Sequence, residues 1–98
     1  MLEVFGYLCN DALVGFVAFE YSDLQTTIEY IAVDDNAQRC GIGSALIEAV
    51  AMAANGGALY AQTDDDAVDF YRRLAFTVEI GSRDIRWPHH TRYDCRRR

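Results

Sequence analysis

The chain has 98 residues, of which 51% are hydrophobic, enough to form the core of one domain near the small end of the range that folds alone. Fifteen acidic residues outnumber nine arginines, lysine is absent, and the net charge of -6 argues against a nucleic-acid-binding protein. No apolar run approaches the roughly 18 residues of a membrane span, and Glu3 precedes any basic residue, so we expect neither a membrane protein nor a signal peptide.

Three scattered cysteines, Cys9, Cys40 and Cys95, form neither a disulfide framework nor a metal-ligand spacing. They favour a reduced, cytoplasmic protein. The absence of lysine excludes a P-loop lysine and a Schiff-base lysine. Six of the nine arginines fall in residues 81–98. This basic segment could contact an acidic partner or the acidic body of the chain itself, although such a terminus is more often simply solvated.

The first 33 residues predict an antiparallel meander. Residues 3–9 and 12–21 read as two strands joined by the turn signal Asn10-Asp11, and residues 26–33 read as a third strand. Gly15 in the second strand indicates a bulge or a close approach of the backbone.

A helix is predicted after Gly43, with an apolar stripe that would lie on the sheet. The stripe consists of Ile42, Leu46, Ala49, Val50 and Ala53. Residues 55–57 end this helix with amino acids that tolerate positive φ. Residues 58–62 are short and apolar, which predicts a buried strand parallel to the third.

A second helix follows Thr63-Asp64-Asp65-Asp66, whose side chains suit a helix start. Its predicted buried face holds Ala67, Val68, Tyr71 and Leu74. Residues 76–80 then predict a strand, 81–88 a loop and 90–95 a final strand. The whole chain, residues 1–98, is therefore predicted to be one α+β domain with a mixed, mostly antiparallel sheet and two helices.

The segment from Gln38 to Gly43 joins a strand to a helix start, where backbone N–H groups can converge on an anion. Two glycines before a helix are also common in a plain tight turn. A dinucleotide-binding fingerprint fits poorly, because Leu46 occupies its third glycine position. A kinase loop is excluded by the missing lysine.

A second segment narrows these alternatives. Residues 67–76, AVDFYRRLAF, resemble the A-x-x-F-Y-x-x-L-G-F signature of the GNAT family of N-acetyltransferases. Gln38, Gly41 and Gly43 match the Q/R-x-x-G-x-G/A acetyl-CoA motif of the same family. The order and spacing of the two segments are also similar, so the resemblance covers about residues 3–80.

The resemblance implies that the pyrophosphate of acetyl-CoA lies over the glycine loop, held by backbone N–H groups from Arg39 to Ser44 and by the charge of Arg39. It also implies that the third and fifth strands splay apart, with the pantetheine between them. The implied cosubstrate-binding residues are Ile31, Val33, Gln38, Arg39, Cys40, Gly41, Ile42, Gly43, Ser44 and Asp64. Only the backbones of Ile31 and Val33 are implicated, since their side chains suit a core, and no metal is expected.

The family's mechanism gives two residues catalytic roles. Tyr71 corresponds to the tyrosine that protonates the departing thiolate, although packing on the buried helix face would also account for it. Glu29 on the third strand could deprotonate the attacking ammonium, or it could be a solvated residue. The acidic body would attract a cationic amine in either case.

Five other residues have plainer interpretations. Cys40 is expected to fill space in the loop, because no base lies near it in sequence. His89 and His90 are expected to line a loop and bind no metal. Trp87 and Tyr93 could shape the acceptor pocket or an interface, with packing the simpler reading.

The match departs from the family in three places. Ala75 replaces the glycine before Phe76, and Asp64 replaces an asparagine. Family members also usually begin with a further strand and two helices that form a wall of the acceptor site, and Met1 starts at what corresponds to their second strand. Either the acceptor site is open or a partner subunit completes it, and we expect a homodimer.

Three functions remain open from the sequence. The first is acetyl-CoA-dependent transfer of an acetyl group to a primary amine on a small molecule or peptide. The second is a non-catalytic CoA-binding sensor or interaction module of the same fold. The third is a structural domain without a ligand, which would require both motif matches to be accidental.

Overall fold

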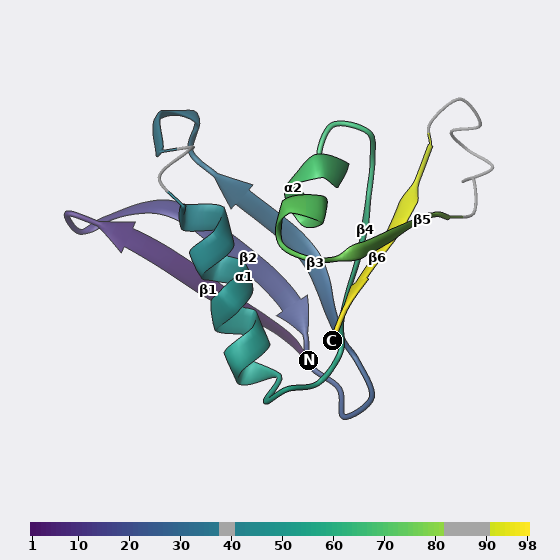
Figure 1. The fold of residues 1–98 in the computed structure, drawn as a ribbon. Helices are drawn as coiled ribbons and strands as arrows, with labels where there is room; N and C mark the ends of the chain where they lie inside the picture. The colour runs from purple at the N-terminus through teal and green to yellow at the C-terminus, as the bar shows by residue number, and fades with distance from the viewer. Residues whose placement is uncertain (38–40, 82–90) are drawn as a thin grey trace.

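A computed structural model describes residues 1–37, 41–81 and 91–98 (Figure 1). Six strands form one sheet in the order β1-β2-β3-β4-β6-β5. The strands are β1 (Leu2–Cys9), β2 (Ala12–Glu20), β3 (Thr26–Val33), β4 (Leu59–Thr63), β5 (Thr77–Ile80) and β6 (Tyr93–Arg97). The helices are α1 (Ile42–Ala53) and α2 (Val68–Arg73), with a short 3-10 helix, η1 (Asp35–Ala37), after β3. The predicted α+β class is confirmed.

The meander of β1, β2 and β3 forms as predicted. Asn10 and Asp11 both have positive φ, 51° and 66°, the conformation of a two-residue hairpin turn whose twist matches the strands. The β1–β2 register shifts between Tyr7 and Leu8, next to Gly15. A β-carbon added to Gly15 would lie 3.1 Å from the Cγ2 of Ile42 on α1. Gly15 therefore combines the predicted bulge with the predicted close approach.

The helix α1 lies across β1, β2 and β3 (Figure 1). Its buried residues are Ile42, Leu46, Ile47 and Val50. The predicted stripe missed Ile47, which is fully buried, and wrongly included Ala53, which is exposed. The helix ends as expected at Asn55 and Gly56, which have φ values of 52° and 82°.

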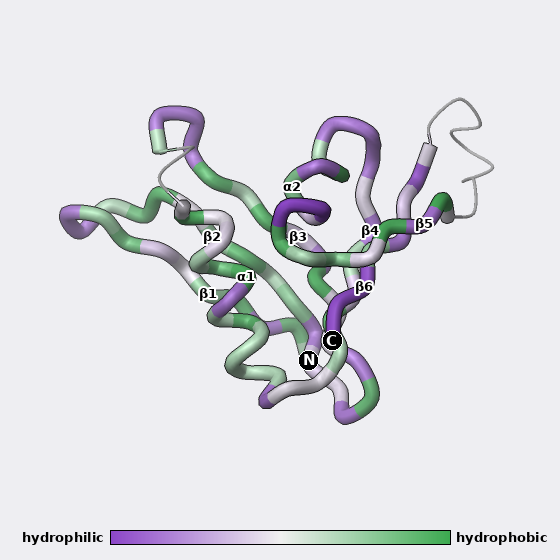
Figure 2. Tube along the Cα trace, viewed as in Figure 1, coloured by the Kyte–Doolittle hydropathy of each residue, from purple (hydrophilic) through white to green (hydrophobic). Residues whose placement is uncertain are grey.

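The core lies between α1, α2 and one face of the sheet, with Val17, Phe19 and Leu59 among its fully buried side chains. Figure 2 shows hydrophobic residues along β2 and part of β3, and hydrophilic residues at the turns and along β6. None of the helices in the described ranges is long and apolar enough to cross a membrane.

Strand β4 pairs parallel to β3, as predicted, and its other edge pairs with β6. Two predictions about the later strands are wrong. The fifth strand cannot splay from the third, because β5 is at the far edge of the sheet, with β4 and β6 between. The final strand is Tyr93–Arg97 and ends two residues later than predicted, because Arg96 and Arg97 still pair with Tyr60 and Leu59 of β4.

Candidate active site

A bulge in β3 separates it from β4. Ile28 pairs with Phe19 and Tyr30 pairs with Ala18, so Glu29 is an extra residue with no counterpart on β2. The parallel pairs between β3 and β4 stop at Ile28. Beyond this point the two strands diverge, so the splay predicted for the third strand occurs between β3 and β4.

A cleft of about 740 Å³ opens beside the separated part of β3. It lies between β3, the first turn of α1 and the start of α2. Its lining residues are Ile31, Ala32, Val33, Gly43, Asp66, Ala67, Phe70 and Arg73. The structure thus brings three of the predicted binding residues, Ile31, Val33 and Gly43, into one cavity.

The first turn of α1 lines this cleft at Gly43. Gly41 caps the helix with φ 76° and ψ 13°, and its carbonyl accepts the N–H of Ala45 at 2.9 Å. A β-carbon on Gly41 would meet nothing within 4 Å. The N–H groups of Ile42, Gly43 and Ser44 belong to the first turn, which has no intrahelical acceptors for them. This geometry suits an anion. Gln38, Arg39 and Cys40, also predicted here, lie outside the described residues.

The two sequence motifs meet at Gly43. A β-carbon on Gly43 would lie 2.8 Å from Cε1 of Phe70, closer than real β-carbons approach a neighbour. Only glycine lets the ring of α2 pack against the start of α1 at this distance. Phe70 therefore fixes the wall of the cleft, a role that the sequence did not assign to it.

Tyr71 lies behind Phe70, in the core. It is 4% exposed, and its ring makes edge-to-face contacts with Phe70 and Phe76, each with centroids 5.1 Å apart. Burial, and secondarily the nearby Cys95 thiol, raises the pKa of Tyr71 to about 12. Its hydroxyl forms no hydrogen bond with the described residues. Every side-chain polar atom that is fully buried among those residues does have a hydrogen-bond partner. The hydroxyl oxygen therefore keeps some contact with solvent.

Glu29 lies on the opposite face of the sheet from α1. Ile28 and Ile31 both pack in or against the core. The bulge leaves two residues between them, Glu29 and Tyr30, and both are exposed on the other face. Tyr30 stacks there on Phe16, with ring centroids 5.6 Å apart. Neither Glu29 nor Tyr71 lines the 740 Å³ cleft.

Asp64 acts on the turn before α2. Its Oδ1 accepts the N–H groups of Asp66 and Ala67 at 3.1 and 3.2 Å. Asp64 does not line the cleft itself, but the turn it holds supplies two residues that do. The carboxylate therefore shapes the cleft through the backbone.

Arg73 was missed by the sequence reasoning. It lines the cleft, and it has no hydrogen bond or ion pair with the described residues. Its neighbour Arg72 instead bonds Asp69 at 2.9 Å. The helical spacing could have identified Arg73, since it follows Phe70 by three residues and must share its helix face.

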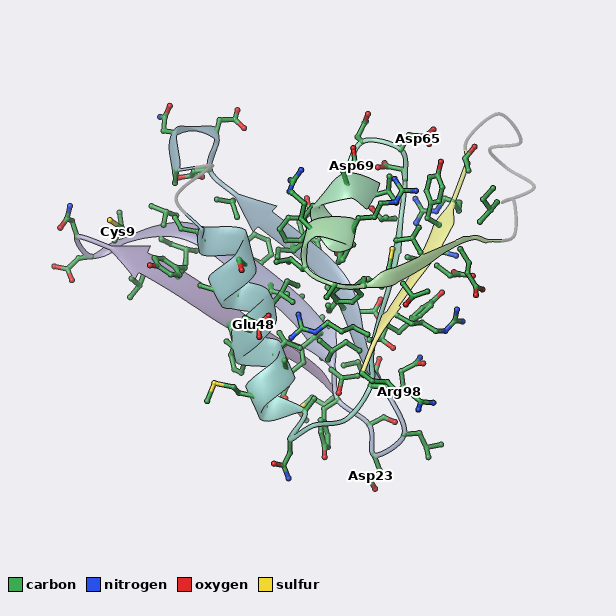
Figure 3. The ribbon with its side chains drawn as sticks, in the orientation of Figure 1. Cys9, Asp23, Glu48, Asp65, Asp69 and Arg98 are labelled. Atoms are coloured by element: carbon green, nitrogen blue, oxygen red, sulfur yellow. The ribbon has the colours of Figure 1, made fainter. Side chains whose placement is uncertain are left out.

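Further acidic side chains lie close to α2 (Figure 3), and Asp66 lines the cleft itself. Asp65 lies in the loop before α2 and Asp69 on the helix. The Tyr93 hydroxyl donates to Asp65 at 2.6 Å, and this bond raises the pKa of Tyr93. Tyr93 thus ties β6 to the loop before α2, which agrees with its expected packing role. Within the described ranges no group of three potential ligands could hold a metal, and Trp87, His89 and His90 lie outside them.

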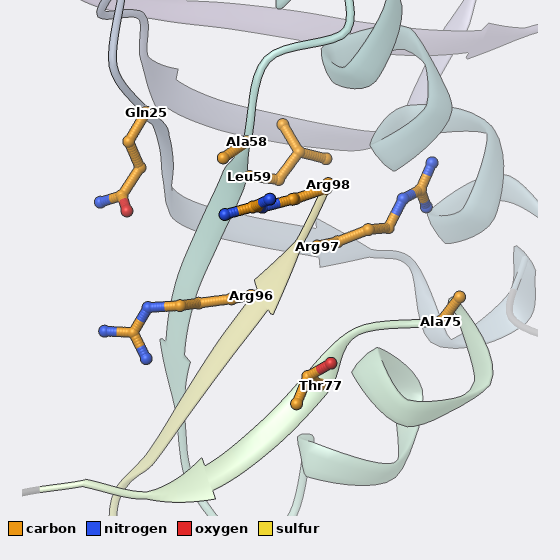
Figure 4. A pocket seen from close by; sticks show the side chains of 8 residues that line it. All are labelled: Gln25, Ala58, Leu59, Ala75, Thr77, Arg96, Arg97 and Arg98. Carbon is orange, nitrogen blue, oxygen red and sulfur yellow. The ribbon is translucent and has the colours of Figure 1, made fainter.

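A second pocket, of about 550 Å³, lies at the other end of β4 and β6 (Figure 4). It is lined by Gln25, Ala58, Leu59, Ala75, Thr77, Arg96, Arg97 and Arg98. Two of its three arginines have acidic partners. Both oxygens of Glu48 on α1 accept from Arg97, at 2.8 and 3.0 Å, and Glu79 lies 4.0 Å from Arg96. Arg96 and Arg97 of the basic segment therefore contact the acidic body of the chain itself.

The comparisons with known proteins point to one family. The family model of the acetyltransferase (GNAT) domain matches residues 2–78. In all, 191 chains of solved structures match the fold, whereas no curated protein matches the sequence.

Three structures illustrate the likeness. A protein from Desulfovibrio desulfuricans assigned to the GNAT family is 21% identical, with a TM-score of 0.86 over 97% of this chain and 67% of that one. An aminoglycoside 6′-N-acetyltransferase complexed with coenzyme A is 15% identical, with a TM-score of 0.85 over 98% and 72%. The ribosomal-protein-S18-alanine N-acetyltransferase of Escherichia coli is 21% identical, with a TM-score of 0.76 over 97% and 67%. Identities this low establish the shared fold, and each neighbour has a longer chain.

Proposed function

Because this chain belongs to the GNAT acetyltransferase family, we propose that it transfers the acetyl group of acetyl-CoA to a primary amine. The observation that carries the proposal is the cleft beside β3. It combines an anion-binding helix start with a strand whose backbone has lost its parallel neighbour. Such a cleft suits an extended ligand with an anionic end and an amide-bearing arm.

Several groups are proposed to hold acetyl-CoA. The N–H groups of Ile42, Gly43 and Ser44 would bind the pyrophosphate, and the guanidinium of Arg73 would add positive charge. The backbones of Ile31 and Val33 would pair with the pantetheine. Open space around Gly41 supports this arrangement, since a β-carbon there has no neighbour within 4 Å. Gln38, Arg39 and Cys40 stay predicted members of the same site, with Asp64 supporting it.

The proposed reaction is direct attack. The neutral amine nitrogen forms a bond to the thioester carbonyl carbon, the carbon–sulfur bond breaks, and the sulfur leaves as a thiolate. The nitrogen releases its surplus proton to solvent as the amide forms. Tyr71 gives its phenolic proton to that sulfur and regains one from solvent. A pKa of about 12 keeps Tyr71 protonated at neutral pH. It also makes the phenol a weaker acid than an ordinary tyrosine, so the transfer requires the thiolate to form beside it.

The amine is proposed to arrive at the face that carries Glu29. An exposed carboxylate there could accept the ammonium proton directly or through water. Residues 1–37 contain acidic side chains and no lysine or arginine, so this half of the chain favours a cationic acceptor, either a small molecule or a peptide. A cytoplasmic location and a homodimer stay predictions from the sequence.

Two measurements test the proposal. Calorimetry should show acetyl-CoA binding to the 98-residue chain, and a thiol-release assay should show turnover with at least one class among small amines, polyamines and peptide N-termini. Binding without turnover of any amine would favour the non-catalytic CoA-binding alternative. Absence of binding would overturn both functions.

A further inference from the structure

The pocket at the end of β6 is basic in an acidic chain. Its volume is about 550 Å³, and it shares no lining residue with the cleft beside β3. Three of its eight lining residues are arginines, Arg96, Arg97 and Arg98, and none of the described residues that line it is acidic. The chain has fifteen acidic residues against nine arginines. Such a lining therefore concentrates positive charge in one place and favours an anion.

The three arginines extend to two sides of the strand. Because side chains alternate along a strand, Arg96 and Arg97 leave it on opposite faces. In Figure 4 the guanidinium of Arg97 turns toward α1, whereas Arg96 and Arg98 both extend to the side of Gln25. Both carboxylate oxygens of Glu48 already accept from Arg97. The charge of Arg97 is thus used within the chain, and Arg96 and Arg98 are the two arginines that a ligand can engage.

The partners of Arg96 and Arg98 within the chain are weak or absent. Arg98 has no hydrogen bond or ion pair with the described residues. Arg96 has only a long ion pair, 4.0 Å to Glu79, in which both side chains are more than half exposed. Exposed pairs of this kind contribute little free energy, so a stronger acceptor can displace Glu79. The guanidinium of Arg96 also lies over the ring of Tyr60, 5.0 Å from its centroid, which restrains the group without neutralising it.

Two neutral side chains complete the polar lining from other parts of the fold. Gln25 lies directly before β3, and Thr77 begins β5. The side-chain amide of Gln25 and the hydroxyl of Thr77 form no hydrogen bond with the described residues. Thr77 pairs with Arg96 across β5 and β6, so the two side chains lie on the same face of the sheet. Hydrogen-bond donors from three elements therefore surround one space.

We propose that this pocket binds the phosphate group of a small molecule, held by the guanidinium groups of Arg96 and Arg98. Each guanidinium presents paired N–H donors that match the oxygens of a phosphate. The two residues are two positions apart, roughly 7 Å between their Cα atoms, so their long side chains can reach the same phosphate. The site is separate from the acetyl-CoA cleft of the proposed function, and the proposal does not depend on acetyl transfer.

The pocket is larger than a phosphate group alone. Its volume lies within the range of small-molecule sites, about 300–1,000 Å³. Ala58, Leu59 and Ala75 supply apolar lining beside the arginines. A phosphate monoester with an apolar group would contact both parts of the pocket, whereas free phosphate would contact only the polar part. The two ligands share the anion and differ in that second contact.

The first experiment titrates the 98-residue chain with inorganic phosphate, replacing chloride at constant ionic strength, and follows the backbone amide shifts by NMR. We expect saturable shifts at the residues that line this pocket. Arg96→Gln and Arg98→Gln should each weaken binding by about 10–100-fold, the range for a hydrogen bond to a charged group. Arg72→Gln is the matched control, because Arg72 lies outside the pocket lining and bonds Asp69. Circular dichroism spectra establish that each variant is folded.

A second pair of variants tests for a gain in affinity. Glu79→Gln removes the carboxylate that competes for Arg96, so it should tighten phosphate binding. Asp11→Asn removes the same charge from the β1–β2 turn, outside the pocket lining, and should leave the affinity nearly unchanged. Equal tightening by both substitutions would show that only the net charge matters and would overturn the site.

Phenyl phosphate, titrated in the same way, separates the two sources of the anion. Tighter binding than inorganic phosphate would support a monoester as the ligand, and equal affinity would support free phosphate. In both cases the shifts should fall on the pocket and depend on Arg96 and Arg98.

Three results would overturn the proposal. The first is a shift that does not saturate, and the second is an affinity that survives both Arg96→Gln and Arg98→Gln. The third is a set of shifts confined to the start of α1, around Gly43, which would place phosphate in the acetyl-CoA cleft alone. Acetyl transfer is measured separately by thiol release, so its failure and the failure of this site are distinguishable.

Discussion

The ring of Phe70 occupies the space in which any side chain on residue 43 would begin. A β-carbon at Gly43 would lie 2.8 Å from Cε1 and 3.2 Å from Cζ of Phe70. One residue belongs to the glycine loop and the other to the second motif. Their contact brings the two motifs together: one forms the start of α1, which is proposed to bind the anion, and the other forms the wall of the cleft beside it.

This contact predicts a coupled pair of substitutions. Gly43→Ala should lower the free energy of unfolding by about 1–3 kcal/mol, because the added methyl overpacks the ring. Phe70→Leu in the same chain should recover most of that loss, since the clash is with the far end of the ring. Chemical denaturation of the single and double variants measures the coupling.

Gly41→Ala is the matched control for this cycle. Its cost, about 1–2 kcal/mol, comes from the positive φ of 76° and not from a neighbour. Phe70→Leu should therefore not relieve it, and the two effects should add. If Phe70→Leu restored the same stability to Gly41→Ala as to Gly43→Ala, the Gly43–Phe70 contact would not be the cause of the loss.

Tyr71→Phe tests the general acid. We expect turnover to fall by about 10²–10⁴-fold, the usual range for a lost proton donor. Acetyl-CoA affinity should stay nearly unchanged, because the hydroxyl forms no hydrogen bond with the described residues and the ring packing is kept. Steady-state kinetics by thiol release and calorimetry separate the two quantities. Unchanged turnover would leave Tyr71 as a packing residue.

The raised pKa of Tyr71 also predicts how stability depends on pH. An unfolded tyrosine loses its proton near pH 10, whereas the folded one holds it to about 12. The contribution of this group is therefore fully present below about pH 10 and is lost as the pH rises toward 12. The loss should be about 2–3 kcal/mol.

Tyr60 and Tyr93 also have raised pKa values, so the wild-type curve alone does not isolate Tyr71. The informative quantity is the difference in unfolding free energy between wild type and Tyr71→Phe. It should be constant up to about pH 10 and then shift against the wild type. A constant difference over the whole range would contradict a buried, high-pKa phenol.

The sequence predicted the helices and strands better than it predicted how they pair and pack. The strand from Thr26 to Val33 was correct to the residue, because a β-branched apolar run between turn signals has one simple reading. The bulge at Glu29 has no such signature, since it depends on how β2 and β3 pair. Ile47 was missed because the helix is covered on a wider face than one apolar stripe suggests. The far-edge position of β5 depends on β6 inserting beside β4, which pattern reasoning does not reveal.

The same holds for the site. Gly43 and the β3 residues Ile31 and Val33 were candidate site residues from the sequence and line the cleft, because backbone chemistry follows from local conformation. Arg73 was not, because its role depends on the packing of α2 against α1.

Arg97 fastens the C-terminal strand to α1. Its guanidinium donates to both carboxylate oxygens of Glu48 and to the carbonyl of Leu74 at 3.1 Å, and it is largely covered. Arg97→Lys should lower the free energy of unfolding by about 1–2 kcal/mol, because an ammonium cannot make this two-pronged bond. Arg98→Lys is the control, since Arg98 has no partner among the described residues. Equal effects of the two substitutions in urea denaturation would contradict the assigned role.

The same ion pair lowers the pKa of Glu48, chiefly through the hydrogen bond from Arg97. A carboxyl with a lowered folded pKa stabilises the protein above its ordinary pKa, and that stability is lost as the pH falls through the lowered value. Glu48→Gln should therefore flatten the acid limb of the stability curve. An unchanged acid limb would show that the exposed pair contributes little.

Arg73 is predicted to bind the anionic end of acetyl-CoA. Because it lines the cleft and has no acidic partner among the described residues, its charge is available to a ligand. Arg73→Gln should weaken acetyl-CoA binding by about 1.5–3 kcal/mol, the range for a hydrogen bond to a charged group. Arg72→Gln is the matched control, since Arg72 bonds Asp69 and lies outside the cleft lining. Calorimetry at low and high salt completes the test, because the difference between the two variants should shrink as salt screens the contact. Equal affinities for both variants at low salt would remove Arg73 from the site.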